Sequence, residues 1–357
     1  MHRLQAIVDV TRGFISPVVL GLLLLVRADL RSNTSNGDPF AFFGPSIRIS
    51  AEERSKLDEG EVIAKTLPAH GHELAIFAAG STTATPENLI DSVRAIVDLK
   101  QSSMVPEIGR FSTPPQLSDL ASLTLDEGDL NAIKKCRPGN CDLKLSPAEI
   151  IRLQPPPASD SEAWIRDTNS IFRQIVFERV TGYLRQGQMA IPQYDTGDDE
   201  VDLAATFALL VQSSPYLRAN LPQVADYFER YPALNVPRLE SFLYWSKERP
   251  SRNSIISVTH VTILRGQPLA DAPEVIVTSK EVFATRYTSG ALAMTVLVRS
   301  GAEGSSRRYL AYLNRTWVDD LRGLWRPIVE WRVRGQASKV FGEARHRIEV
   351  WNPKERQ

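Results

Sequence analysis

Five β-rich runs follow one another through the last third of the chain, separated only by short turn signals. The runs are SFLYWSKER, SIISVTHVTILR, EVIVTSKEVFATRY, ALAMTVLVRS and RRYLAYLNR, and turns are predicted at residues 250–253, 266–273, 289–290 and 301–306. A parallel connection needs a crossover of about a dozen residues or more, whereas an antiparallel connection needs only a hairpin. The spacing therefore predicts an antiparallel meander, around which the rest of the chain has to pack.

The second of these runs contains an uncharged strand, ISVTHVTIL, with His260 at its centre. One side of this strand carries Val258, His260 and Thr262, and the other carries only small polar and β-branched side chains. A sheet with one solvated face carries charges on that face, so we expect this strand to be covered on both faces. His260 is then buried, either as a hydrogen-bonded core residue, as a polar contact in a ligand cavity or as a catalytic group.

The part of the chain before this meander is predicted to form strands first and helices after them. Residues 61–67 and 73–83 are predicted strands, and Thr85 followed by Pro86 is typical of a helix start. A short strand is expected in VPEIGRFS, and residues 116–240 are mostly helical in pattern, with a capping box at Ser146 and Glu149. An apolar stripe in WVDDLRGLWRPIVEWRVR predicts a terminal amphipathic helix; it consists of Leu321, Leu324, Trp325, Ile328 and Val329.

The N-terminus and the two cysteines indicate export. The apolar run from Phe14 to Val26 is short for a membrane span and suits a signal peptide, residues 1–28, cleaved after Ala28. An uncleaved N-terminal membrane anchor is the alternative. A polar tether is expected over residues 29–56. Cys136 and Cys141 enclose a turn-forming Arg-Pro-Gly-Asn, so we expect a local disulfide, which an oxidising compartment would preserve.

Charge and motifs exclude several classes of function. Lys plus Arg and Asp plus Glu are equal in number, at 42 each, so the chain lacks the basic excess that favours nucleic acid. The sequence contains no nucleotide-binding, zinc-protease or nucleophile-elbow motif, and no ligand spacing that predicts a metal or a cofactor.

The order of elements resembles the START-like superfamily, whose helix-grip fold is a curved antiparallel sheet around a C-terminal helix. The resemblance lies in ELAIFAAGSTTATPENLIDSVRAIVDLKQSSMVPEIGRF and in the stretch from ISVTHVTIL to VEWRVR. The segments CRPGNCDLKLS and FLYWSKE are also similar to uncharacterised bacterial exported proteins. The resemblance implies an α+β helix-grip fold built from residues 57–115 and 241–351, and residues 116–240 depart from it as a large helical insertion.

A fold of this kind implies a cavity for an apolar small molecule or a lipid. The expected ligand-binding residues are His260, Thr262, Tyr244, Tyr287, Met294 and Tyr312. The first hypothesis is an exported, noncatalytic binding protein, for which contact with a membrane surface stays open. The alternatives are a cyclase-like or hydrolase-like enzyme that uses His260 or Tyr287, and an envelope interaction module that exposes Trp164 or Tyr227.

Overall fold

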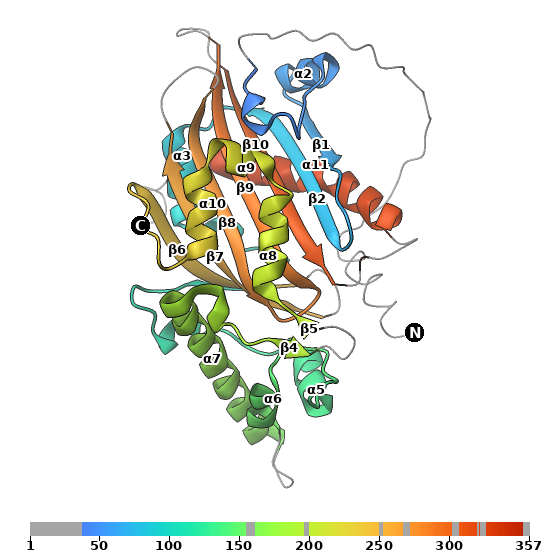
Figure 1. The fold of residues 1–357 in the computed structure, drawn as a ribbon, viewed down its shortest axis with the longest axis vertical. Helices are drawn as coiled ribbons and strands as arrows, with labels where there is room; N and C mark the ends of the chain where they lie inside the picture. The colour runs from blue at the N-terminus through green and yellow to red at the C-terminus, as the bar shows by residue number, and fades with distance from the viewer. Residues whose placement is uncertain are drawn as a thin grey trace.

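The computed structural model describes residues 38–154, 161–195, 200–249, 253–266, 272–301, 307–319, 321 and 326–352. Its centre is one curved, unclosed antiparallel sheet of eight strands in the order β1-β2-β10-β9-β8-β7-β6-β3 (Figure 1). The strands are β1 (Val62–Thr66), β2 (Glu73–Thr82), β3 (Glu107–Arg110), β6 (Leu239–Glu248), β7 (Ile255–Arg265), β8 (Pro273–Ala284), β9 (Thr288–Ser300) and β10 (Arg307–Val318). The predicted meander is confirmed as β6 to β10.

Strands from the two ends of the chain share this sheet. The N-terminal strand β2 pairs with β10, with Ala79 opposite Ala311, and β3 pairs with β6, with Gly109 opposite Trp245. The two stretches separated by the helical excursion therefore form one β-surface, as the sequence predicts. The α+β class with a curved antiparallel sheet is confirmed.

Helices cover both faces of the sheet. They are α2 (Ala51–Asp58), α3 (Pro86–Arg94), α4 (Ile96–Lys100), α5 (Glu127–Lys135), α6 (Pro147–Leu153), α7 (Ser161–Gln186), α8 (Leu203–Gln212), α9 (Pro215–Asn220), α10 (Pro222–Arg230) and α11 (Arg326–Glu349). A two-stranded ribbon, β4 (Tyr194–Asp195) with β5 (Glu200–Val201), and three short 3₁₀ turns, Ala41–Phe43, Leu117–Leu120 and Gly187–Ala190, complete the described elements.

Local capping explains where several helices begin. Thr85 accepts a hydrogen bond from the backbone N–H of Asn88, and Ser146 accepts one from Glu149, whose carboxylate returns to Ser146. Asp202 caps α8 through the amides of Ala204 and Ala205. Each cap satisfies N–H groups that the helix itself leaves without a partner.

The insertion between β3 and β6 covers one face of the sheet, which we call the insertion face. Figure 1 shows α8, α9 and α10 across the front of the sheet, with α5, α6 and α7 below them and α11 behind. Phe207, Leu210 and Phe228 pack there with Met294 and Val296 of β9. Helices α5 to α7 form a second cluster against β6, β7 and β8, which includes Trp245, Val258 and Phe283.

The opposite face, which we call the α11 face, is covered by α3, α4 and α11. Leu89, Phe341 and Ile348 pack there with Val261 and Leu310 of the sheet. Most of both faces of ISVTHVTIL is therefore covered, as its lack of charge predicts, while Thr259 and Leu264 stay partly exposed.

Helix α11 begins at Arg326 and crosses β1 and β2 closely. A Cβ on Gly80 of β2 would lie 2.7 Å from Arg345 Nη1, so glycine is what allows this approach. The predicted apolar stripe is only partly correct: Leu321 and Val329 are buried, whereas Ile328 is 43% exposed, and Leu324 and Trp325 lie outside the described residues. The sheet-facing side instead continues to Phe341 and Ile348.

The expected tether over residues 29–56 is wrong in the part that the structure describes. Residues 38–56 contain most of α2, and Phe40, Phe43 and Ile47 are buried in the core with Phe77 of β2. The polar run SNTSNGDPF suggests a tether, because the aromatic residues that anchor the segment begin only at its last position, Phe40. The predicted signal peptide lies outside the described residues.

The predicted disulfide is confirmed: Cys136 and Cys141 are bonded across the turn, with their Cα atoms 4.3 Å apart. Within the described ranges, no helix has the length and apolar character needed to cross a membrane.

Candidate functional site

The α11 face of the sheet is covered unequally. Toward one end Ala78, Val261, Val277, Leu297 and Leu310 are buried, and toward the other the same face is partly exposed on five adjacent strands. We call these partly exposed residues the accessible band. They are Thr259, Ser279, Glu281, Ala291, Ala293, Thr295, Tyr312, Asn314, Thr316, Leu74 and Ile76.

Strand register makes the accessible band continuous. Thr259 lies opposite Glu281, Ala293 lies between Ser279 and Asn314, and Asn314 lies opposite Ile76. The side chains are mostly short, and all of them are partly exposed. The band is polar at β7 and β8 and apolar at β2, and β10 places Tyr312, Asn314 and Thr316 between the alanines of β9 and the β2 end.

A partly exposed ion pair forms the polar edge of the band. Lys100 of α4 donates to the hydroxyl of Tyr244 at 3.1 Å and to Glu248 Oε1 at 3.0 Å. The positive charge of Lys100 lowers the pKa of Glu248. Desolvation acts to lower the pKa of Lys100, but the negative charge of Glu248 outweighs it, so the pKa of Lys100 is raised. The two side chains nevertheless keep 31% and 40% of their surface exposed, so solvent reaches them.

Tyr312 lies on the same face of the sheet as this ion pair, on the more distant strand β10. Burial raises the pKa of its hydroxyl to about 12, and the charges of Lys100 and Glu248 also act on it. Three strands, β9, β8 and β7, separate β10 from β6. Charges interact appreciably only over short distances in a protein, so the sheet has to curve to bring Tyr312 near the Lys100–Glu248 pair.

Glu281 is the ionisable group within the band itself. Its carboxylate accepts a hydrogen bond from Thr288 Oγ1 at 2.9 Å. Burial raises the pKa of Glu281 to about 7, against the opposing attraction of Lys144. A carboxyl group of this kind accepts hydrogen bonds when ionised and exchanges a proton near neutral pH.

A buried lysine holds the insertion to the sheet beside Glu281. Lys144 is ion-paired with Asp319 at 2.7 Å and donates to Ser289 Oγ at 2.9 Å, and Ser289 donates to Asp319 at 2.5 Å. A serine beside a lysine can act as a nucleophile only if the lysine can accept its proton. Ser289 donates to Asp319 and accepts from Lys144, and it is 2% exposed, so the arrangement is structural.

His260 lies on the insertion face, away from the band. It is 1% exposed, and its ring is enclosed by Tyr183, Tyr227, Phe228 and Tyr231. Its Nδ1 lies 2.9 Å from the Tyr183 hydroxyl and its Nε2 lies 3.4 Å from that of Tyr227. Burial, with the charge of Lys280, lowers the pKa of His260 to about 3, so the ring is neutral. It has the surroundings of a hydrogen-bonded core residue.

Lys280 lies opposite His260 on β8 and is also buried. Its Nζ donates to the carbonyl of Phe228 at 3.4 Å and lies 4.0 Å from the ring centroid of Phe207. Burial lowers its pKa to about 7. Lys280 therefore has far weaker partners than Lys144, although both are buried.

The sheet divides the six predicted ligand-binding residues. Tyr244 and Tyr312 lie on the α11 face, at the polar edge of the band. His260, Thr262 and Met294 are buried on the insertion face, where Thr262 donates to the carbonyl of Thr278 at 3.3 Å. Tyr287 lies in the β8–β9 hairpin with a left-handed φ of 64°. The six residues consequently do not line one cavity.

Sequence reasoning missed Lys100, Glu248 and Glu281. A signal was present for Glu281, because a charge in the middle of EVIVTSKEVFATRY has to be paired, buried at a cost or placed beside a cavity. Another polar atom faces the sheet from α11: Gln336 Oε1 is buried and has no hydrogen-bond partner.

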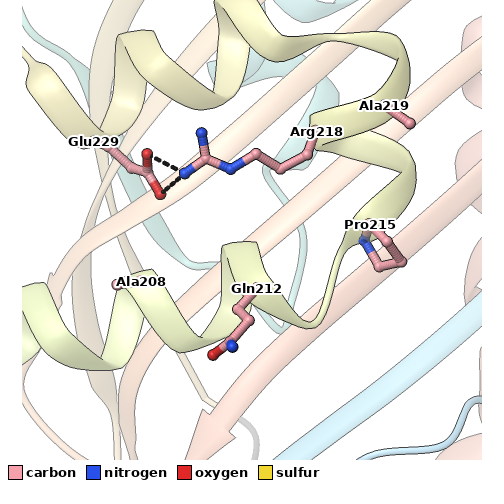
Figure 2. A pocket seen from close by; sticks show the side chains of 6 residues that line it. All are labelled: Ala208, Gln212, Pro215, Arg218, Ala219 and Glu229. Carbon is pink, nitrogen blue, oxygen red and sulfur yellow. Dashed lines mark hydrogen bonds and ion pairs between the residues drawn. The ribbon is translucent and has the colours of Figure 1, made fainter.

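A separate pocket of about 560 Å³ opens on the outer surface of the insertion, between α8, α9 and α10. Figure 2 shows Arg218 reaching across it to Glu229, and Arg218 also pairs with Asp226 at 3.0 Å. Because both carboxylates hold this guanidinium, the pocket presents no free charge to a ligand.

Among the residues that the structure describes, no group of three His, Cys, Asp or Glu side chains is arranged to hold a metal ion. Comparison with known proteins returned no match: no protein-family model, no curated protein and no solved structure is similar to this chain. The accessible band has therefore to be interpreted from its own residues.

Proposed function

We propose that this is an exported, noncatalytic binding protein with a START-like helix-grip fold, which holds a lipid or another apolar small molecule between the sheet and α11. The accessible band is the observation that carries the proposal. A partly exposed sheet face that lies beside a helix and is lined mostly by short side chains offers a surface on which a small molecule can lie.

The chemistry of the band fits this role. Leu74, Ile76 and the alanines of β9 offer apolar surface, and a few polar groups, among them Glu281 and Tyr312, could orient a ligand. The disulfide is compatible with export, since such bonds persist in oxidising compartments.

The two alternative functions have weaker support. His260 and Tyr287 do not meet in one pocket, so they do not form the acid–base pair that an enzyme of the proposed kind would use. Trp164 and Tyr227 are 5% and 7% exposed, so neither offers the contiguous apolar patch expected of an interaction module.

Native mass spectrometry of the full chain purified from its own host tests the proposal. We expect a mass excess that corresponds to one small molecule and is released by organic solvent. Ala293→Trp, which fills the band, should abolish the excess, whereas Ala208→Trp, in the pocket between α8 and α10, should leave it unchanged.

The pair of variants makes the result decisive. Loss of the ligand from Ala208→Trp with retention in Ala293→Trp would place the site on the insertion and refute the proposal. An unmodified mass for the wild-type protein, together with no binding of any apolar probe, would also refute it. Circular dichroism of both variants verifies that each retains its fold.

A further inference from the structure

The two ends of the accessible band differ in polarity. At the β7 and β8 end lie the hydroxyl groups of Thr259 and Ser279 and the carboxyl group of Glu281, and at the β2 end lie Leu74 and Ile76, next to Asn314 and Thr316 of β10. An amphiphile can place its polar group beside Glu281 and its apolar part over the alanines of β9 and the β2 end.

The groups at the polar end differ in how far they are already satisfied. Lys100 and Glu248 are bonded to each other, and Tyr244 accepts a hydrogen bond from Lys100. Glu281 accepts from Thr288 alone among the hydrogen bonds of the described residues. A carboxylate has about four acceptor positions on two oxygens, so most of the capacity of Glu281 is unused.

The charges that face Glu281 argue against an anionic ligand. Lys144 is paired with Asp319 and Lys100 is paired with Glu248, so neither of these two lysines is left to attract a second carboxylate. An anionic head group beside Glu281 would meet like charge at low dielectric, which is unfavourable.

We infer that the amphiphile bound in the accessible band carries a neutral or cationic hydrogen-bond donor, a hydroxyl or an amine, and that Glu281 receives it. The inference rests on the proposed function and goes further by naming the class of head group and the residue that selects it. Gln336 Oε1, which is an acceptor on α11 without a partner, is consistent with a ligand that donates.

Three probes with the same chain length isolate the head group. Dodecan-1-ol, dodecylamine and dodecanoate compete with the neutral fluorophore N-phenyl-1-naphthylamine for the full chain at pH 8. We expect the alcohol and the amine to displace the fluorophore at concentrations about tenfold lower than dodecanoate, since one like-charge contact accounts for a factor of this order.

Substitutions assign the preference to Glu281. Glu281→Gln, which keeps the size and an acceptor, should bring the three probes within about threefold of one another, and Glu281→Lys should make dodecanoate the best competitor. Glu343→Gln, an exposed carboxyl on α11, is the matched control and should behave as wild type.

The outcomes separate the two proposals. If dodecanoate competes as well as the alcohol and Glu281→Gln changes nothing, the head-group inference is overturned while the binding function stands. If no probe displaces the fluorophore from the wild-type protein, or the fluorophore itself does not bind, both are overturned.

Discussion

Replacing Lys280 by methionine should stabilise the protein at neutral pH. Lys280 is 2% exposed, and its amine has one hydrogen bond, 3.4 Å long, to the Phe228 carbonyl. Methionine matches its length and volume and needs no such partner. Removal of a poorly solvated charge from a core is one of the few substitutions that raise stability by more than about 1 kcal/mol.

The magnitude follows from the pKa of Lys280, which burial lowers from 10.5 to about 7. A pKa difference of one unit corresponds to about 1.4 kcal/mol. Burial of this amine therefore lowers the free energy of unfolding at pH 7 by up to about 4 kcal/mol. The contacts with Phe228 and Phe207 are worth about 1 to 2 kcal/mol and are lost in the variant. We therefore expect a net gain of about 2 kcal/mol in the free energy of unfolding.

The gain should depend on pH in one direction. Between pH 7 and 10.5 the unfolded chain holds a proton on this amine that the folded protein has released, so raising the pH favours folding of the wild type. The advantage of Lys280→Met should accordingly shrink by about 2 kcal/mol between pH 7.5 and 9.5. Below pH 7 it should be constant.

Guanidinium unfolding followed by tryptophan fluorescence, at pH 6, 7.5 and 9.5, measures the difference between the two proteins. Lys144→Met is the matched control, because Lys144 is 3% exposed but is paired with Asp319 and Ser289. That variant should lose about 2 to 3 kcal/mol at each pH. A Lys280→Met protein that is less stable than wild type at pH 7.5, or whose advantage does not change with pH, would refute the reasoning.

Two further predictions concern the band and the disulfide. Burial raises the pKa of Glu281 to about 7. Between about pH 4.5 and 7 the folded protein therefore keeps a proton on Glu281 that the unfolded chain has lost. The free energy of unfolding should fall as the pH rises through that window. Glu281→Gln should thus raise the melting temperature more at pH 8 than at pH 5. The difference should be equivalent to about 1 kcal/mol, because the partial exposure of Glu281 weakens the effect. An equal effect at both pH values would contradict this prediction. Replacing both Cys136 and Cys141 by alanine should cost about 2 kcal/mol or less, because the bond closes a short loop, and differential scanning calorimetry that found a far larger loss would show that the turn does more than close this loop.

Much of the fold could be predicted from local patterns. The turn spacing identified the meander, and Thr85 and Ser146 marked helix starts that the structure confirms. The start of α11 could not be predicted as well, because the stripe that contains Ile328 and Val329 looks core-facing on a helical wheel, whereas Ile328 is 43% exposed. Period alone determines which residues share a helix face, but tertiary packing determines which face is turned to the core.

The candidate site was harder to predict than the fold for a related reason. Alternation along β7 correctly placed His260 and Thr262 on one face and Thr259 on the other, yet nothing in the strand says which cover each face receives. His260 and Thr262 are accordingly among the predicted ligand contacts, and Thr259 is not. The structure reverses that priority, because His260 is sealed by aromatic rings and Thr259 is reached by solvent.

The unequal covering of the two faces also gives the helical insertion a role. Its helices bury most of the insertion face at β7 to β9. This packing forms a core that does not depend on full coverage of the opposite face by α11. Among the strands, β1 and β2 lie closest to α11, and α3 and α4 cover one end of the same face, so the rest of this face can carry short side chains without loss of the fold. On this argument stability is concentrated on the insertion face, and the proposed binding site lies on the α11 face. Substitutions around His260 should then change the free energy of unfolding, whereas substitutions in the accessible band should change ligand affinity first.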